Sequence, residues 1–215
     1  MPKTIRMLFI GNSFTARNNV PGLIAGLADA DGKRTSIGYE LISAGGASLR
    51  QHLNKGEAQK AMKKSKFDYV VLQEQSTLPV KNTERFYENV RDFAPIIKEA
   101  GAKPVLYMTW ARKKLPETQK TLTDSYNAIG KELGAAVVPA GSAWKNYFKK
   151  YPGTILHDDD GSHPNLAGSY LAACTIYASL LQRDPTGLKD DIKLDEAEKL
   201  KLQRIARQTA KVKRR

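Results

Sequence analysis

The chain alternates short apolar runs with longer stretches in which apolar residues recur every three or four positions. The short runs are rich in Val, Ile and Leu and end at Gly or polar residues, which is typical of buried strands. Strands are therefore expected at residues 4–10, 35–43, 67–73, 102–109 and 135–140. The longer stretches predict helices at residues 20–32, 48–64, 82–101, 116–134, 141–150, 165–182 and 194–212.

This alternation of strand and helix predicts a parallel α/β sheet with helices on both faces. The run FDYVVLQ at 67–73 is apolar almost throughout, as a strand covered on both faces would be. Asn82 is the expected N-cap of the next helix, and Pro95 is expected to kink that helix. In such sheets ligands bind beyond the carboxyl ends of the strands, so polar residues at those ends are the candidate site.

The charge of the chain is concentrated near its C-terminus. The 215 residues are enough for one sizeable core, and they carry a formal net charge of +13. We expect one domain over residues 1–190 with a basic helix or tail, residues 191–215, attached to it. Residues 199–215 hold eight Lys and Arg and no acid, which indicates a solvated helix end or a surface for anionic partners. Nucleic acid is an unlikely partner, because no aromatic residue interleaves these basic residues.

Cysteine usage and the N-terminus bear on the compartment. Cys174 is the single cysteine and lies in the apolar run LAACTIYASLL, which predicts a buried thiol and excludes an intramolecular disulfide. The start MPKTIRMLFIG lacks the long apolar core and cleavage site of a signal peptide, so a cytoplasmic protein is expected. A removed export signal is the alternative. No run reaches the roughly 18 apolar residues that a membrane span needs.

Three segments at the expected sheet edge offer the groups that acyl transfer requires. Ser13, in IGNSFT after the first strand, supplies a hydroxyl. Asp160 and His163, in DGSHPN, are three residues apart, so a carboxylate can reach the imidazole Nδ1–H and leave Nε2 for a serine. Backbone N–H groups of Ser13 and Gly46, with a glutamine amide, could stabilise an oxyanion. The set predicts a nucleophilic serine.

Structural roles are the alternatives for several of these residues. Instead of acting as a nucleophile, Ser13 could serve as the N-cap of a helix that starts after the first strand. Trp110, at the end of the fourth strand, is either a core aromatic or a wall of the site that stacks on a sugar face or an acyl chain. His52 falls on a helix near the active-site edge and is expected to be a surface or lid residue rather than a catalytic one. His157 and the three acids that follow it form an irregular ligand set, so neither a metal nor another cofactor is expected.

The blocks GNSFT, GGASL and DGSHPN resemble those of the SGNH/GDSL hydrolase superfamily, and the resemblance covers residues 5–182. It implies a flavodoxin-like three-layer α/β/α sandwich with a five-stranded parallel sheet, and ester hydrolysis without a metal. By position, Ser13 would be the nucleophile and His163 the base. Asp160 would orient His163, and Gly46 would donate its backbone N–H to the oxyanion.

The third block departs from the usual pattern of that superfamily. VVLQEQS lacks the Asn of the usual Gly-x-Asn and resembles the Gln-containing block of carbohydrate acetylesterases. This suggests Gln73 as an oxyanion donor, with Gln75 as second choice. The expected substrate is a small-molecule ester with a short acyl group, such as an O-acetylated carbohydrate. The alternatives are an acyltransferase with the same triad, or a non-enzymatic protein that binds anionic surfaces through its tail.

Overall fold

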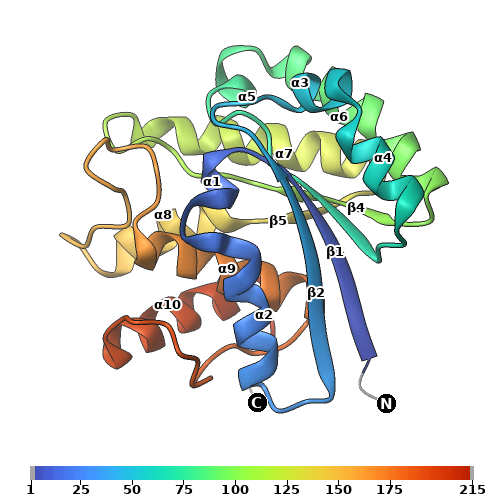
Figure 1. The fold of residues 1–215 in the computed structure, drawn as a ribbon. Coiled ribbons are helices and arrows are strands. Elements are labelled where there is room, and N and C mark those ends of the chain that lie inside the picture. Colours follow the sequence, from blue (N-terminus) through green and yellow to red (C-terminus); the bar gives the residue numbers. More distant parts are fainter. Residues whose placement is uncertain (1–2, 214–215) are drawn as a thin grey trace.

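The computed structural model describes residues 3–213 and has five parallel strands in the order β2-β1-β3-β4-β5 (Figure 1). The strands are β1 (Lys3–Gly11), β2 (Thr35–Ser43), β3 (Tyr69–Leu72), β4 (Lys103–Tyr107) and β5 (Ala136–Val138). In register, Gly11 pairs with Ser43 of β2 and Ile10 with Leu72 of β3, so the carboxyl ends of β1, β2 and β3 meet at one edge. This strand order is that of flavodoxin-like folds, and it places a crevice between β1 and β3.

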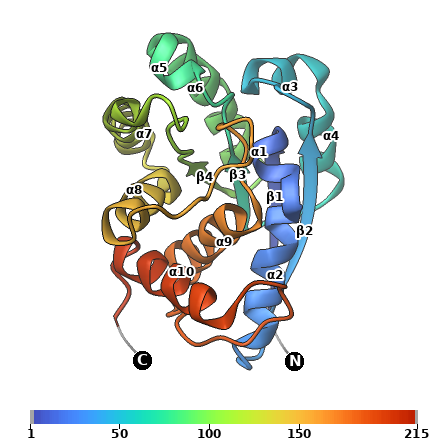
Figure 2. The ribbon, with the colours of Figure 1, turned by 90° about the vertical axis from the view of Figure 1, so that its left-hand side faces the viewer.

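Helices cover both faces of the sheet, which confirms the predicted three-layer sandwich. Figure 1 shows α2, α8, α9 and α10 below the sheet and α3, α4, α6 and α7 above it, and Figure 2 shows the same layers from the side. The helices are α1 (Ser13–Ala16), η1 (Arg17–Asn19), α2 (Val20–Ala30), α3 (Leu49–Lys55), α4 (Glu57–Lys64), α5 (Leu78–Lys81), α6 (Thr83–Glu99), η2 (Pro116–Thr118), α7 (Gln119–Leu133), α8 (Ala140–Lys150), α9 (Leu166–Leu181) and α10 (Glu196–Thr209).

The carboxyl half of β1, an inner strand of the sheet, is buried on both faces. Met7 and Phe9 belong to the apolar cluster under α2 and α9, while Leu8 and Ile10 belong to the cluster under α6. All four side chains are fully buried, as the alternation of side chains along a strand requires for a strand between two layers. This burial fixes the position of the strand end, and therefore the starting point of the segment that follows Gly11.

The helix predicted over 48–64 is wrong in one respect, because the structure divides it into α3 and α4. Gly56 separates them with a φ of 71°, a left-handed conformation that glycine adopts without steric cost. Its N–H donates to the carbonyls of His52 and Leu53, which closes the end of α3. The predicted cap at Asn82 is confirmed, and Pro95 lies within α6 without ending it.

The first part of the basic C-terminal segment packs onto the domain. Lys199 of α10 is buried, and its Nζ lies 3.3 Å from a carboxylate oxygen of Asp190. Leu202 and Ile205 are buried beside α9, while Arg214 and Arg215 lie outside the described residues. The division of the chain at residue 190 stays a prediction. Within residues 3–213, no helix combines the length and apolar character needed to cross a bilayer.

Close packing of α8 on the end of β4 leads to a first prediction. A Cβ on Gly141 would lie 2.0 Å from the carbonyl oxygen of Thr109, which is backbone and cannot move aside cheaply. We expect Gly141→Ala to lower the free energy of unfolding by about 3 kcal/mol or more. Gly26→Ala in α2 is the matched control, since nothing lies within 4 Å of its Cβ position.

Chemical denaturation of both variants checks this expectation. The alanine in α2 should stabilise the protein by about 0.5–1 kcal/mol, because glycine loses more backbone entropy in a helix. Equal free energies of unfolding for the two variants would contradict the packing described here.

Candidate active site

Ser13 lies in the first turn after β1. The side chain of Asn12, and not that of Ser13, caps α1, because its Oδ1 accepts a hydrogen bond of 3.1 Å from the N–H of Phe14. The Nδ2 of Asn12 donates to the carbonyl of Ala47 at 3.0 Å, which ties this turn to the loop after β2. The hydroxyl of Ser13 is therefore not used in capping the helix.

A chain of hydrogen bonds joins Ser13, His163 and Asp160. Ser13 Oγ lies 2.8 Å from His163 Nε2, although the two residues are 150 positions apart. His163 Nδ1 is hydrogen-bonded to Asp160 Oδ2. Asp160 Oδ1 accepts the N–H groups of Ser162 and His163, each at 2.9 Å. The three predicted residues are thus brought together in the order hydroxyl, imidazole, carboxylate.

The charge on Asp160 determines which nitrogen of His163 carries the proton. The hydrogen bond from the His163 ring, followed by those from the backbone of His163 and Ser162, holds the pKa of Asp160 far below its usual range. An ionised carboxylate can only accept, so His163 Nδ1 must be the donor. In the neutral imidazole, Nε2 then has a lone pair directed at the Ser13 hydroxyl.

Two aromatic rings support the loop that carries His163. The ring of Phe14 packs against the His163 ring, with 5.3 Å between the ring centroids, and stacks on Trp110, with 5.0 Å between the centroids. Trp110 donates from Nε1 to the carbonyl of Ser162 at 3.1 Å and stacks on Trp144 at 3.9 Å. Only 2% of Trp110 is exposed, so the structure favours the core alternative for this residue.

The turn after β2 presents a second backbone donor. Gly46 has a φ of 66° and is exposed in the loop that Asn12 anchors through Ala47. Neither the N–H of Ser13 nor that of Gly46 donates to another residue in the described part of the chain. Both are consequently open to an external acceptor.

Gln73 does not face this space, contrary to the prediction. It is 1% exposed, and its Oε1 accepts from Asn12 N and Thr15 Oγ1, both at 2.9 Å. Its amide nitrogen donates to the carbonyl of Glu74. The two bonds to Oε1 fix the start of α1 next to the end of β3, and the buried amide is not accessible to a ligand. We therefore withdraw Gln73 as the donor.

Gln75 has the free amide that Gln73 lacks. Its Oε1 accepts the N–H groups of Thr77 and Leu78, at 2.9 and 3.0 Å, and so begins the turn into α5. Its amide nitrogen donates to no residue among those described, and the side chain is partly exposed. Of the two glutamines, Gln75 is the one that can donate to a ligand.

Comparison with known proteins identifies the family. No family model matches this chain, and no curated protein does. Among solved structures, a protein of Slackia heliotrinireducens described as a candidate SGNH hydrolase is 27% identical, with a TM-score of 0.70. The similarity covers 81% of this chain and 98% of the other. The chain belongs to the SGNH/GDSL hydrolase superfamily.

Two further solved structures share the SGNH fold at lower identity. A DUF4886 family protein of Bacteroides uniformis is 21% identical, with a TM-score of 0.79 over 96% of this chain and 95% of the other. An acetyl-xylooligosaccharide esterase of Geobacillus is 18% identical, with a TM-score of 0.59 over 80% and 93% of the two chains. These two similarities show the shared fold alone.

Sequence reasoning did not predict the structural role of Glu74, which is buried and connects two segments of this candidate site. Its Oε1 accepts the N–H of Leu49 at 3.0 Å and that of Gln75 at 2.7 Å, and its Oε2 accepts from Asn89. Burial raises the pKa of Glu74, against the lowering effect of these hydrogen bonds. An acid between two glutamines at the end of a buried strand was the available signal.

His52 also differs from its expected position at the surface. It is 2% exposed, and its Nε2 lies 2.7 Å from the carbonyl oxygen of Gly11. Burial lowers the pKa of His52, so the neutral ring is favoured. It holds the end of β1 from the side opposite to α2.

Proposed function

We propose that this chain is a serine hydrolase that cleaves carboxylic esters with short acyl groups through an acyl-enzyme. The observation that carries the proposal is the continuous hydrogen-bonded chain from Ser13 Oγ through His163 to Asp160. In this arrangement a base contacts the nucleophile and a carboxylate contacts the base, which is the requirement for nucleophilic catalysis by serine. The coarser assignment, a hydrolase of the SGNH superfamily, agrees with the similar structures.

In the first half of the reaction, Ser13 Oγ attacks the ester carbonyl carbon while His163 Nε2 takes the hydroxyl proton. The carbonyl π electrons move to oxygen, and the resulting oxyanion accepts hydrogen bonds from the N–H groups of Ser13 and Gly46 and from the Gln75 amide. Asp160 stabilises the imidazolium through Nδ1. The tetrahedral intermediate then collapses, and the leaving alkoxide takes the proton from His163.

In the second half, water attacks the acyl group on Ser13 Oγ. His163 Nε2 removes a proton from that water and returns it to Ser13 Oγ as the new tetrahedral intermediate collapses. The product is a carboxylic acid, and the enzyme is restored. The same groups act in both halves, so no further residue is needed.

The substrate class rests on the third block and on the similar acetyl-xylooligosaccharide esterase. Both support a short acyl group, and a carbohydrate O-acetyl ester is the preferred substrate. Hydrolysis of p-nitrophenyl acetate, p-nitrophenyl octanoate and acetylated xylooligosaccharide tests the assignment. We expect kcat/KM to be highest for the acetyl esters. A preference for octanoate would reject the short-acyl part of the proposal.

Replacing Gln75 tests the third oxyanion donor. Gln75→Glu keeps the oxygen that caps α5 but replaces the amide donor with a carboxylate, so the local fold should persist. We expect kcat for p-nitrophenyl acetate to fall about 100- to 1,000-fold, since this is the usual cost of losing one donor. The melting temperature should stay close to that of the wild type.

Gln73→Ala is the comparison. It removes the acceptor for Asn12 and Thr15, so a lower melting temperature is expected. If Gln75→Glu kept its kcat, Gln75 would not be the donor.

A further inference from the structure

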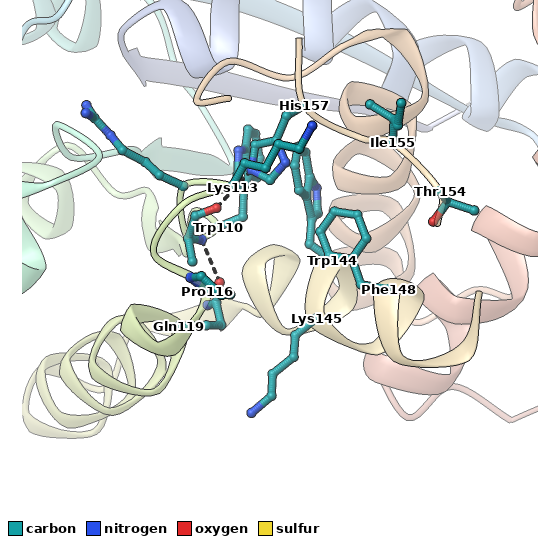
Figure 3. Close-up of a pocket in the computed structure, with 12 residues that line it drawn as sticks. Trp110, Lys113, Pro116, Gln119, Trp144, Lys145, Phe148, Thr154, Ile155 and His157 are labelled. Carbon is teal, nitrogen blue, oxygen red and sulfur yellow. Dashed lines mark hydrogen bonds between the residues drawn. The ribbon is translucent and has the colours of Figure 1, made fainter. Parts of the chain in front are cut away.

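The structure has a cavity of about 410 Å³, and Figure 3 shows the residues that line it. Its walls come from the segment after β4, from α8 and from the segment before His157. Most of the lining is apolar, including Trp110, Pro116, Trp144, Phe148 and Ile155. Ile155 is 60% exposed, so its side chain offers apolar surface to a ligand. The volume suits a small organic molecule.

The charged residues that line this cavity are all basic. Arg112, Lys113 and Lys145 are exposed at its rim, and no acidic residue lines it. None of these three side chains forms an ion pair with a residue that the structure describes. Unpaired cations beside an apolar wall give a positive potential that attracts an anion more strongly than an open surface does.

The cavity is distinct from the place where Ser13 meets His163. None of the proposed catalytic residues or oxyanion donors lines it. A stack of rings connects the two places, because Phe14 packs on His163 and stacks on Trp110, and Trp110 and Trp144 line the cavity. His157 forms part of the wall and is fixed there, because its Nε2 lies 2.9 Å from the carbonyl oxygen of Ala111 and its ring stacks on Phe148.

The wall of the cavity also braces the loop that carries Asp160 and His163. The N–H of Lys113 donates to the carbonyl of Gly161 at 2.8 Å, and Trp110 donates to Ser162. A molecule in the cavity would therefore contact the segment that holds this loop.

We propose that this cavity binds a small organic anion. The apolar or aromatic body of the ligand packs on Phe148 and Ile155, and its carboxylate or similar group is attracted by the charges of Lys113 and Lys145. The anion is either a free ligand or the charged end of an ester substrate. Binding does not depend on the proposed reaction, so the two proposals can fail separately.

Intrinsic fluorescence reports directly on this site. The chain has two tryptophans, and both line the cavity. The probes are 4-phenylbutyrate and the uncharged 4-phenylbutan-1-ol, which share their body and differ in the head group. We expect saturable changes in tryptophan emission, with affinity about tenfold or more in favour of the carboxylate, and weaker binding at high salt. Equal affinity for the two probes would overturn the proposal.

A pair of double variants with equal charge change separates the site from general electrostatics. Lys113→Glu with Lys145→Glu should weaken phenylbutyrate binding about tenfold or more. Lys114→Glu with Lys149→Glu changes exposed neighbours that do not line the cavity, and should leave the affinity within about twofold. Equal losses in both would reject a specific anion site.

Ester assays identify the source of the anion. The esters are p-nitrophenyl hemiglutarate, with an anionic acyl end, and p-nitrophenyl valerate. If the anion belongs to the substrate, the variant at 113 and 145 loses kcat/KM for the hemiglutarate alone, and phenylbutyrate competes with that ester. If the anion is a free ligand, phenylbutyrate binds without competing with either ester. Ser13→Ala should bind phenylbutyrate as the wild type does, and loss of binding there would contradict a separate cavity.

Discussion

Ser13→Ala is expected to abolish ester hydrolysis and labelling by a fluorophosphonate. Without Oγ no acyl-enzyme can form. Any remaining hydrolysis would come from water attacking an ester that the oxyanion donors polarise. We expect kcat for p-nitrophenyl acetate to fall at least about 10⁴-fold, as in other hydrolases that lose a member of a serine triad. Release of p-nitrophenol and the mass of the labelled protein are the measurements.

The fold should survive this change, which makes the result interpretable. Asn12 caps α1, so the Ser13 hydroxyl contributes no bond to the helix start. Ser162→Ala is the matched control, because this serine lies next to His163 and its hydroxyl bonds to no described residue. It should retain both turnover and labelling. A Ser13→Ala protein that still carried the adduct would identify another nucleophile and end the present proposal.

The position of the site was predictable because topology is encoded in the hydrophobic pattern. Parallel strands have their carboxyl ends at one edge, so Ser13 after the first strand and a polar loop before the last long helix had to approach each other. The spacing of Asp160 and His163 within one turn then predicted that the carboxylate would contact the imidazole Nδ1 and leave Nε2 for the Ser13 hydroxyl. Neither conclusion required knowledge of side-chain packing.

The choice between the two glutamines depended on packing and could not be predicted. Gln73 and Gln75 share parity along the strand, so alternation assigns them to the same side. Hydrogen bonds to Asn12 and Thr15, which are distant in sequence, draw Gln73 beneath α1. The break at Gly56 was likewise not predicted from the sequence. The residues on both sides favour one continuous helix, but the left-handed backbone of Gly56 divides it into α3 and α4.

Asp160→Asn is expected to reduce kcat about 10⁴-fold while leaving the loop folded. The asparagine Oδ1 can still accept the N–H groups of Ser162 and His163. Its amide, however, donates where the carboxylate accepted, so His163 must carry its proton on Nε2. That tautomer cannot take the proton of Ser13, so His163 no longer acts as a base although its ring stays in place.

The pH dependence follows from the lowered pKa of Asp160. A carboxyl group with a lowered folded-state pKa contributes its full stability above its unfolded pKa, and this stability is lost progressively as the pH falls from there through the lowered value. Between about pH 5 and pH 8, Asp160 therefore stays ionised. Asp160 should therefore contribute no proton to the acid limb of kcat/KM.

Asp159→Asn is the control, because its side chain is exposed and takes no part in the chain to Ser13. It should keep the wild-type rate and pH profile. Two protons on the acid limb of the wild type would show that Asp160 titrates in this range. If Asp160→Asn kept most of its activity, Asp160 would not orient His163, and the base would need another partner.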